Sequence, residues 1–133
     1  MKRRNFLNAT LAATAAGALA GCASTATIPS KARVVVVGGG YGGATAAKYV
    51  RMLSNYKIDV VMVEPNGAFV SCPISNLVIG GSKTLSDITT PYDHLSGKHG
   101  VQFVKDMVSA IDAKGKRVTL AGGASIGYDK LIL

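Results

Sequence analysis

A run of four valines that passes directly into a glycine-rich segment is the feature that most constrains the fold of this chain. Residues 34–37 are all valine, and residues 38–43 read Gly-Gly-Gly-Tyr-Gly-Gly. A continuous β-branched run without polar alternation is typical of a parallel strand buried on both faces. The residues from Ala44 to about Ser54 predict a helix, so the order of elements is strand, glycine turn, helix.

The helix and the next strand extend this unit. Ala47, Val50 and Leu53 recur at three-residue steps, and we expect the face that they form to lie on the sheet. A second apolar run, residues 58–63, predicts another strand, and it is followed by Glu64. Glu64 comes about 20 residues after the last glycine of the motif, where an acidic side chain can accept hydrogen bonds from an adenosine ribose.

The glycine spacing has a mechanical explanation in a dinucleotide-binding unit. Gly38 permits a tight turn, Gly40 lets the backbone approach a pyrophosphate, and Gly43 lets the helix pack closely on the strand. The helix start then offers unpaired N–H groups to the phosphates. The pattern fits NAD or FAD, while the carboxylate argues against NADP. The residues predicted to contact the cofactor are Gly38, Gly39, Gly40, Tyr41, Gly42, Gly43, Glu64, Pro65 and Asn66.

Composition excludes several other classes of protein. The net charge of +8 suggests nucleic-acid binding, but three of the 15 basic residues lie within the first four positions. The others are scattered and are not interleaved with aromatic residues, so a solvated basic surface is the better interpretation. Two cysteines are too few for a disulfide scaffold, and no apolar run is long enough to span a membrane.

Residues 1–30 predict an export signal and linker, which leaves residues 31–133 for the folded domain. Arg3 and Arg4 precede Phe6 and Leu7 and an alanine-rich stretch, a pattern that resembles the twin-arginine signal. An ordinary secretory signal is the alternative, and both place the protein in the periplasm. The segment ends either at a cleavage site after Ala20 or at a lipoprotein box in which Cys22 carries a lipid anchor.

The segment after Glu64 is unusual for a nicotinamide-dependent dehydrogenase. Turn-forming residues 65–67 lead to Cys72, and beyond Pro73 a short helix is expected through about Ile79, closed by two glycines. On these residues alone, Cys72 is either a small buried side chain or a thiol close to the cofactor.

Residues 34–50 and 64–81 closely resemble the flavoprotein subunits of flavocytochrome c sulfide dehydrogenases, within the FAD-dependent pyridine nucleotide-disulfide oxidoreductase superfamily. The resemblance implies FAD attached covalently through Cys72, sulfide as substrate and a c-type cytochrome subunit as partner. It implies a FAD-dependent oxidoreductase as the full-length protein, but it identifies no catalytic residue in this chain, so we expect this fragment alone to be inactive. Single-cysteine flavin disulfide reductases and NADH oxidases are the alternative, as is a non-catalytic nucleotide-binding module.

The remaining residues predict scaffold of an α/β, Rossmann-like FAD-binding domain. Pro91 is expected to open a short helix, and His94 and His99 are expected at the surface, without a metal site. Residues 101–104 predict a parallel strand. Residues 107–111, 117–120 and 125–128 predict an inserted β-meander, and residues 128–133 begin another buried strand. Because the family is much longer, we expect this chain to be an amino-terminal fragment, incomplete at its carboxyl end.

Overall fold

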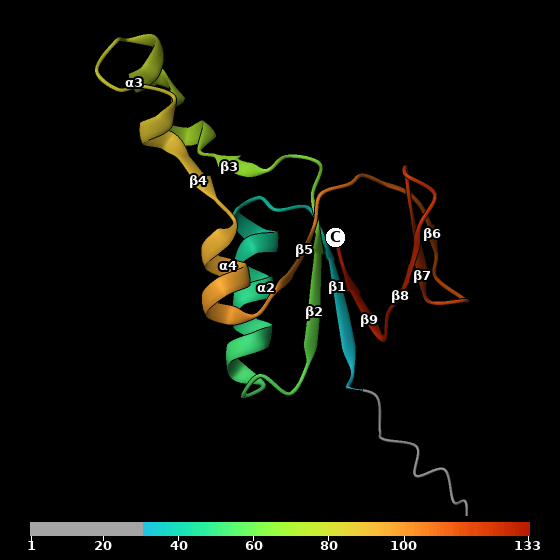
Figure 1. The fold of residues 1–133 in the computed structure, drawn as a ribbon. Coiled ribbons are helices and arrows are strands. Elements are labelled where there is room, and N and C mark those ends of the chain that lie inside the picture. The colour runs from blue at the N-terminus through green and yellow to red at the C-terminus, as the bar shows by residue number, and fades with distance from the viewer. Residues whose placement is uncertain (1–30) are drawn as a thin grey trace, which may run out of the picture. The chain divides into compact units, whose positions relative to one another are not determined.

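The computed structural model describes residues 31–133, so the predictions for residues 1–30, including the signal and Cys22, lie outside the described residues. A four-stranded sheet forms the centre, and all of its strand pairs are parallel (Figure 1). Its strands, in spatial order, are β5 (Gln102–Val104), β2 (Asp59–Val63), β1 (Arg33–Val37) and β9 (Lys130–Ile132). The predicted parallel sheet of an α/β fold is confirmed.

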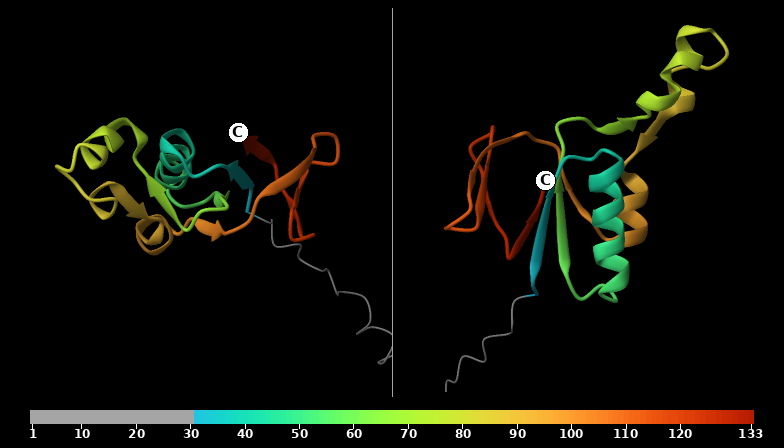
Figure 2. Two further views of the ribbon diagram at one scale, coloured as in Figure 1. Left: turned by 90° about the horizontal axis from the view of Figure 1, so that it is seen from above. Right: turned by 180° about the vertical axis from the view of Figure 1, so that it is seen from behind.

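Both faces of this sheet are covered, which explains its uninterrupted valine runs. On one face, Val34 and Val36 belong to a core cluster beneath helices α2 (Tyr41–Leu53) and α4 (Asp93–His99). On the other face, Val35 packs with Val118 and Leu120 of an antiparallel meander. The meander contains β6 (Val108–Asp112), β7 (Arg117–Leu120) and β8 (Ser125–Gly127). Figures 1 and 2 show the resulting order of helices, sheet and meander.

An arm rises from the carboxyl end of β2 (Figure 1). The short helix expected through about Ile79 is confirmed in it, whereas its two paired strands were not predicted. Strands β3 (Ala68–Val70) and β4 (Thr89–Pro91) pair antiparallel and carry short helices between them. These helices are η1 (Cys72–Ile74), α3 (Ser75–Ile79) and η2 (Ser86–Ile88). The predicted helix start at Pro91 is wrong, because Pro91 closes the two-stranded pairing opposite Ala68 and α4 begins at Asp93.

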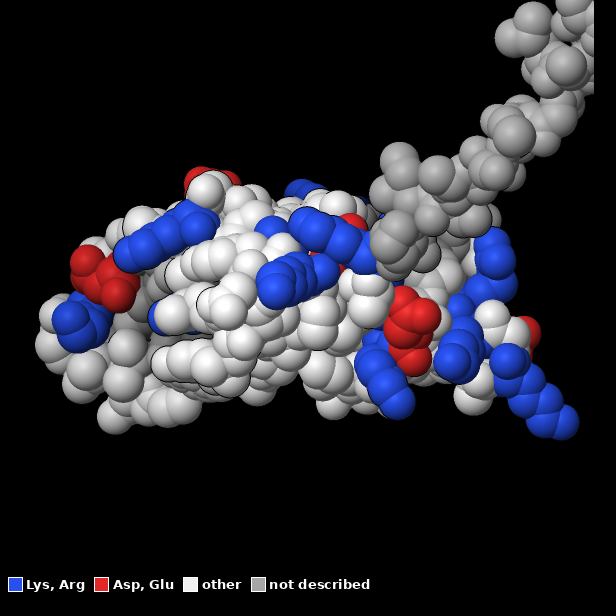
Figure 3. All heavy atoms as spheres, turned by 90° about the horizontal axis from the view of Figure 1, so that it is seen from below, with Lys and Arg blue, Asp and Glu red and all other residues white. Residues whose placement is uncertain are grey.

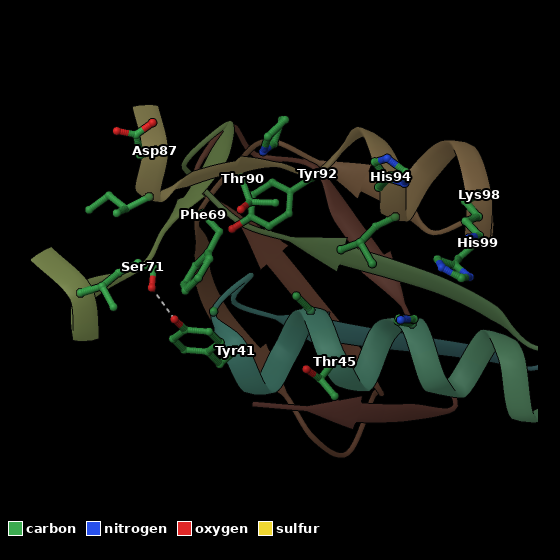
Figure 4. Close-up of a pocket in the computed structure, with 17 residues that line it drawn as sticks. Tyr41, Thr45, Phe69, Ser71, Asp87, Thr90, Tyr92, His94, Lys98 and His99 are labelled. Atoms are coloured by element: carbon green, nitrogen blue, oxygen red, sulfur yellow. Dashed lines mark hydrogen bonds between the residues drawn. The ribbon is translucent and has the colours of Figure 1, made fainter. Parts of the chain in front are cut away.

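Two side-chain predictions are also wrong. Leu53 is 81% exposed, because each three-residue step rotates the helix face by about 60° and Leu53 has turned away from the sheet. Arg51 lies closer to the buried face, and its guanidinium donates hydrogen bonds to the carbonyl oxygens of His99 and Ile58. His99 is only 8% exposed, and in Figure 4 it points from α4 toward α2.

Within residues 31–133, the structure contains no helix long and apolar enough to cross a membrane and no cluster of three potential metal ligands. Lys and Arg side chains are interspersed with uncharged and acidic ones on the face at the amino ends of the parallel strands (Figure 3).

The contact between α2 and β1 gives the first prediction. A Cβ on Gly43 would overlap the carbonyl oxygen of Gly38 and lie 3.3 Å from Cγ1 of Val36, whereas a Cβ on Gly42 meets nothing within 4 Å. Gly43→Ala should therefore lower the free energy of unfolding by about 1–3 kcal/mol, measured by chemical denaturation. Gly42→Ala is the matched control and should leave stability unchanged or raise it, since alanine favours helix. Equal effects of the two substitutions would contradict the steric explanation.

Candidate cofactor site

The glycine turn connects the carboxyl end of β1 to the start of α2. Gly38 has φ of +96°, in the region that favours glycine, and its N–H donates to the carbonyl oxygen of Val63 at 2.8 Å. A Cβ on Gly40 would meet nothing within 4 Å, so the backbone there is open to a ligand. The turn therefore has the conformation and the open space expected of a phosphate-binding loop.

Helix α2 begins at Tyr41, three residues earlier than predicted, so Gly42 and Gly43 belong to its first turn. Gly40 is the N-cap, no side chain caps the helix, and no acidic residue lies in the first turn. The uncapped N–H groups and the positive end of the helix dipole therefore favour an anionic ligand near Gly40.

Glu64 is held at the carboxyl end of β2, next to the glycine turn. Its Oε2 accepts a hydrogen bond from the N–H of Gly39 at 2.8 Å, and its Oε1 accepts bonds from the backbone and side-chain N–H groups of Asn66 at 3.0 and 2.7 Å. Partial burial raises the pKa of Glu64, but the hydrogen bonds from Gly39 and Asn66 outweigh this, so its pKa lies below 4.5. Glu64 is therefore an anion at neutral pH.

Tyr92 is a residue of this site that sequence reasoning missed. It is 5% exposed, and its hydroxyl donates a hydrogen bond to the carbonyl oxygen of Gly39 at 2.9 Å. Burial and the nearby charge of Glu64 raise the pKa of Tyr92 above its ordinary value of 10.0, so the hydroxyl keeps its proton. Tyr92 lies in a polar segment far along the chain from Glu64, and no motif or spacing in the sequence indicated that it belongs to the site.

Cys72 lies in the arm, as the first residue of η1. It is an exposed free thiol, with Sγ 3.8 Å from the carbonyl oxygen of Val70. The preceding residue, Ser71, shares a hydrogen bond with the hydroxyl of Tyr41, whose ring stands edge-on to Phe69. The loop before Cys72 is thus attached to the start of α2.

Two cavities meet at the glycine turn. A smaller one of about 340 Å³ is lined by Gly40, Glu64 and Asn66, together with residues of β3. A larger one of about 590 Å³ runs between α2, the arm and α4, and Figure 4 shows Tyr41, Ser71 and the histidines of α4 around it. Gly40, Phe69 and Tyr92 line both cavities.

The structure brings together some of the predicted residues and separates others. Gly40, Glu64 and Asn66 share one cavity, while Gly40 and Tyr41 share the other. Gly39 is buried beneath the ring of Tyr92 and takes part through its backbone only. The remaining predicted residues, Gly38, Gly42, Gly43, Pro65 and Cys72, line neither cavity.

The model of the pyridine nucleotide-disulphide oxidoreductase family matches residues 32–133, which is nearly all of the described part. The chain belongs to this family. A sulfide dehydrogenase [flavocytochrome c] flavoprotein chain from Chlorobaculum thiosulfatiphilum is 63% identical over 46 residues, which cover 35% of this chain and 94% of that sequence. The superfamily of FAD-dependent disulfide oxidoreductases, expected from the sequence, is confirmed.

Sulfide oxidoreductases occur among the longer relatives as well. A sulfide-quinone reductase from Aquifex aeolicus is 33% identical over 101 residues, covering 75% of this chain and 23% of that protein. The crystal structure of the sulfide:quinone oxidoreductase from the same species superimposes with a TM-score of 0.67 at 29% identity, again over 75% of this chain and 23% of the other. The chain therefore spans about a quarter of the length of these relatives.

The lowered pKa of Glu64 predicts how stability depends on pH. Because the folded state favours the carboxylate, Glu64 contributes stability above the unfolded pKa of about 4.5, and this contribution is lost as the pH falls through the folded value. Glu64→Gln should lower stability at neutral pH and weaken its loss toward about pH 3, measured by denaturation at a series of pH values. Asp93→Asn, which removes an exposed carboxylate of α4, is the control. An unchanged pH profile in Glu64→Gln would contradict this prediction.

Proposed function

We propose that this chain forms the FAD-binding part of the flavoprotein subunit of a sulfide dehydrogenase, which oxidises sulfide to sulfur or polysulfide and passes the electrons to a c-type cytochrome subunit. The observation that carries the proposal is the 63% identity to the flavoprotein chain of a sulfide dehydrogenase [flavocytochrome c]. The similarity to sulfide-quinone reductase supports the same substrate class with a different acceptor. The proposal of a cytochrome partner rests on the similarity to the flavocytochrome c flavoprotein chain.

The residues of the site fit FAD. Glu64 has two carboxylate oxygens that can accept further hydrogen bonds from ribose hydroxyls, and Gly40 offers open backbone beside the uncapped start of α2. The larger cavity continues from Gly40 to Ser71, next to Cys72, so an extended dinucleotide can reach from one cavity toward the arm. FAD, when bound, supplies a ring system that accepts two electrons.

Cys72 is the proposed point of covalent attachment, through a thioether between Sγ and the 8α carbon of the flavin. Cys72 would supply the sulfur of this bond and FAD the methyl carbon; forming the bond releases two protons, which would go to water, and two electrons, which would pass through FAD singly to the c-type cytochrome. The exposure of the thiol and its place beside the Tyr41–Ser71 hydrogen bond support this assignment.

The full-length holoprotein that contains this chain, assembled with its cytochrome subunit, tests both parts of the proposal. After acid denaturation its flavin should remain on the peptide that contains Cys72, and sulfide should cause reduction of the c-type cytochrome. In Cys72→Ser, which replaces an exposed sulfur with oxygen, the flavin should be released on denaturation, detected by absorbance of the soluble fraction.

A single-cysteine disulfide reductase or NADH oxidase is the second candidate function, because the exposed thiol of Cys72 is also suited to act as a redox-active thiol. In that case the wild-type flavin dissociates on denaturation, Cys72 reacts with an alkylating reagent, and NADH supports turnover. Release of all flavin from the denatured wild-type protein would therefore overturn covalent attachment. An absence of both sulfide and NADH oxidation, with flavin bound, would favour a non-catalytic binding module.

We also propose periplasmic localisation by the twin-arginine route, on the basis of Arg3, Arg4, Phe6 and Leu7. Replacing Arg3 and Arg4 with lysine should retain the protein in the cytoplasm, measured by cell fractionation, because the receptor reads the arginine pair. Export of this variant at the wild-type level would favour an ordinary secretory signal. Cys22→Ser, examined by mass spectrometry of the mature protein, separates lipidation at Cys22 from cleavage after Ala20.

A further inference from the structure

Both polar groups of Gly39 are fixed by side chains from distant parts of the chain. Its N–H donates to Oε2 of Glu64 at 2.8 Å, and its carbonyl oxygen accepts from the hydroxyl of Tyr92 at 2.9 Å. Tyr92 is 5% exposed, and its ring packs against Phe103 of β5 with 5.0 Å between centroids. The hydroxyl is therefore presented to Gly39 by a side chain with little freedom to move.

The hydrogen bond to the carbonyl of Gly39 also orients the next N–H. No cis peptide occurs in the described chain, and in a trans peptide the C=O of one residue and the N–H of the following residue point in opposite directions. The carbonyl of Gly39 points toward Tyr92, so the N–H of Gly40 points away from it. Among residues 31–133 this N–H has no hydrogen-bond acceptor, and Gly40 lines both cavities.

We infer that Tyr92 is a positioning residue, which holds the peptide between Gly39 and Gly40 so that the N–H of Gly40 is aimed at the pyrophosphate of the bound dinucleotide. The same hydrogen bond points the carbonyl oxygen of Gly39 away from the phosphates. The partial negative charge of this oxygen would otherwise repel them. This inference rests on the proposed function, since it assumes a dinucleotide in the site.

The ring of Tyr92 explains why residue 39 is glycine. A Cβ on Gly39 would overlap the hydroxyl oxygen of Tyr92 and lie 2.6 Å from the ring carbon that bears it. Gly39 and Tyr92 are therefore a matched pair, in which the missing side chain makes room for the ring. Gly39 thus makes room for Tyr92, while its role as a cofactor contact stays a prediction.

The test compares Tyr92→Phe with its parent in the full chain, both carrying Cys72→Ser so that FAD binds without the proposed covalent bond and its Kd can be measured. Phenylalanine keeps the ring and removes the donor, so the Kd for FAD should rise roughly three- to tenfold, the range for loss of one neutral hydrogen bond. The ³¹P resonances of bound FAD should also shift, a change that lower stability alone does not produce. Tyr128→Phe is the matched control, because its hydroxyl lies 3.5 Å from the carbonyl oxygen of Asp112, outside both cavities, and it should change neither quantity.

A second measurement does not depend on the folding of the variant. In the wild-type chain, the amide proton of Gly40 should become protected from hydrogen exchange when FAD binds. Lack of protection, or unchanged affinity and ³¹P resonances in Tyr92→Phe, would overturn the role of Tyr92 while leaving FAD binding intact. If the wild-type chain binds no FAD, the proposed function itself fails, so the two failures are distinguishable.

Discussion

The absence of a side chain at Gly43 is the constraint on which the rest of the site depends. It allows α2 to start against the carbonyl group of Gly38, immediately after β1 ends. The first turn of the helix therefore lies at the carboxyl edge of the sheet, where its N-cap, Gly40, lines the same cavity as Glu64. A larger residue at this position would push the helix away and separate the phosphate-binding turn from the carboxylate.

The order of strands explains why the cavities form at this edge. From β1 the chain continues through α2 to β2 on one side, whereas β9 pairs with β1 on the other. β1 therefore ends at a switch point, where connections leave in opposite directions and open a crevice above the strand ends. The helices and the meander bury the two faces of the sheet, so the edge remains the place where polar groups such as Glu64 can meet a ligand.

Two largely buried polar side chains connect elements that are far apart in the chain by donating hydrogen bonds to backbone carbonyl oxygens. Tyr92 binds the carbonyl of Gly39 from the start of α4, and Arg51 joins the end of α2 to the carbonyl oxygens of His99 and Ile58. Both side chains are largely buried, and both satisfy backbone carbonyls that no helix or strand partner would satisfy. Because Tyr92 already holds the glycine turn, the turn needs less reorganisation when an anion binds.

The sequence by itself determined the parallel strands, the glycine turn, Glu64 and the meander, because each depends on local spacing or on runs of apolar residues. It misplaced the start of α2, since Gly42 and Gly43 oppose helix by intrinsic propensity and only packing against Gly38 accounts for them. The pairing of β3 with β4, the burial of His99 and the hydrogen bond from Tyr92 to Gly39 were decided by the tertiary structure alone. Each depends on contacts between residues far apart in the chain, and such contacts leave no periodicity in the sequence from which they could be predicted.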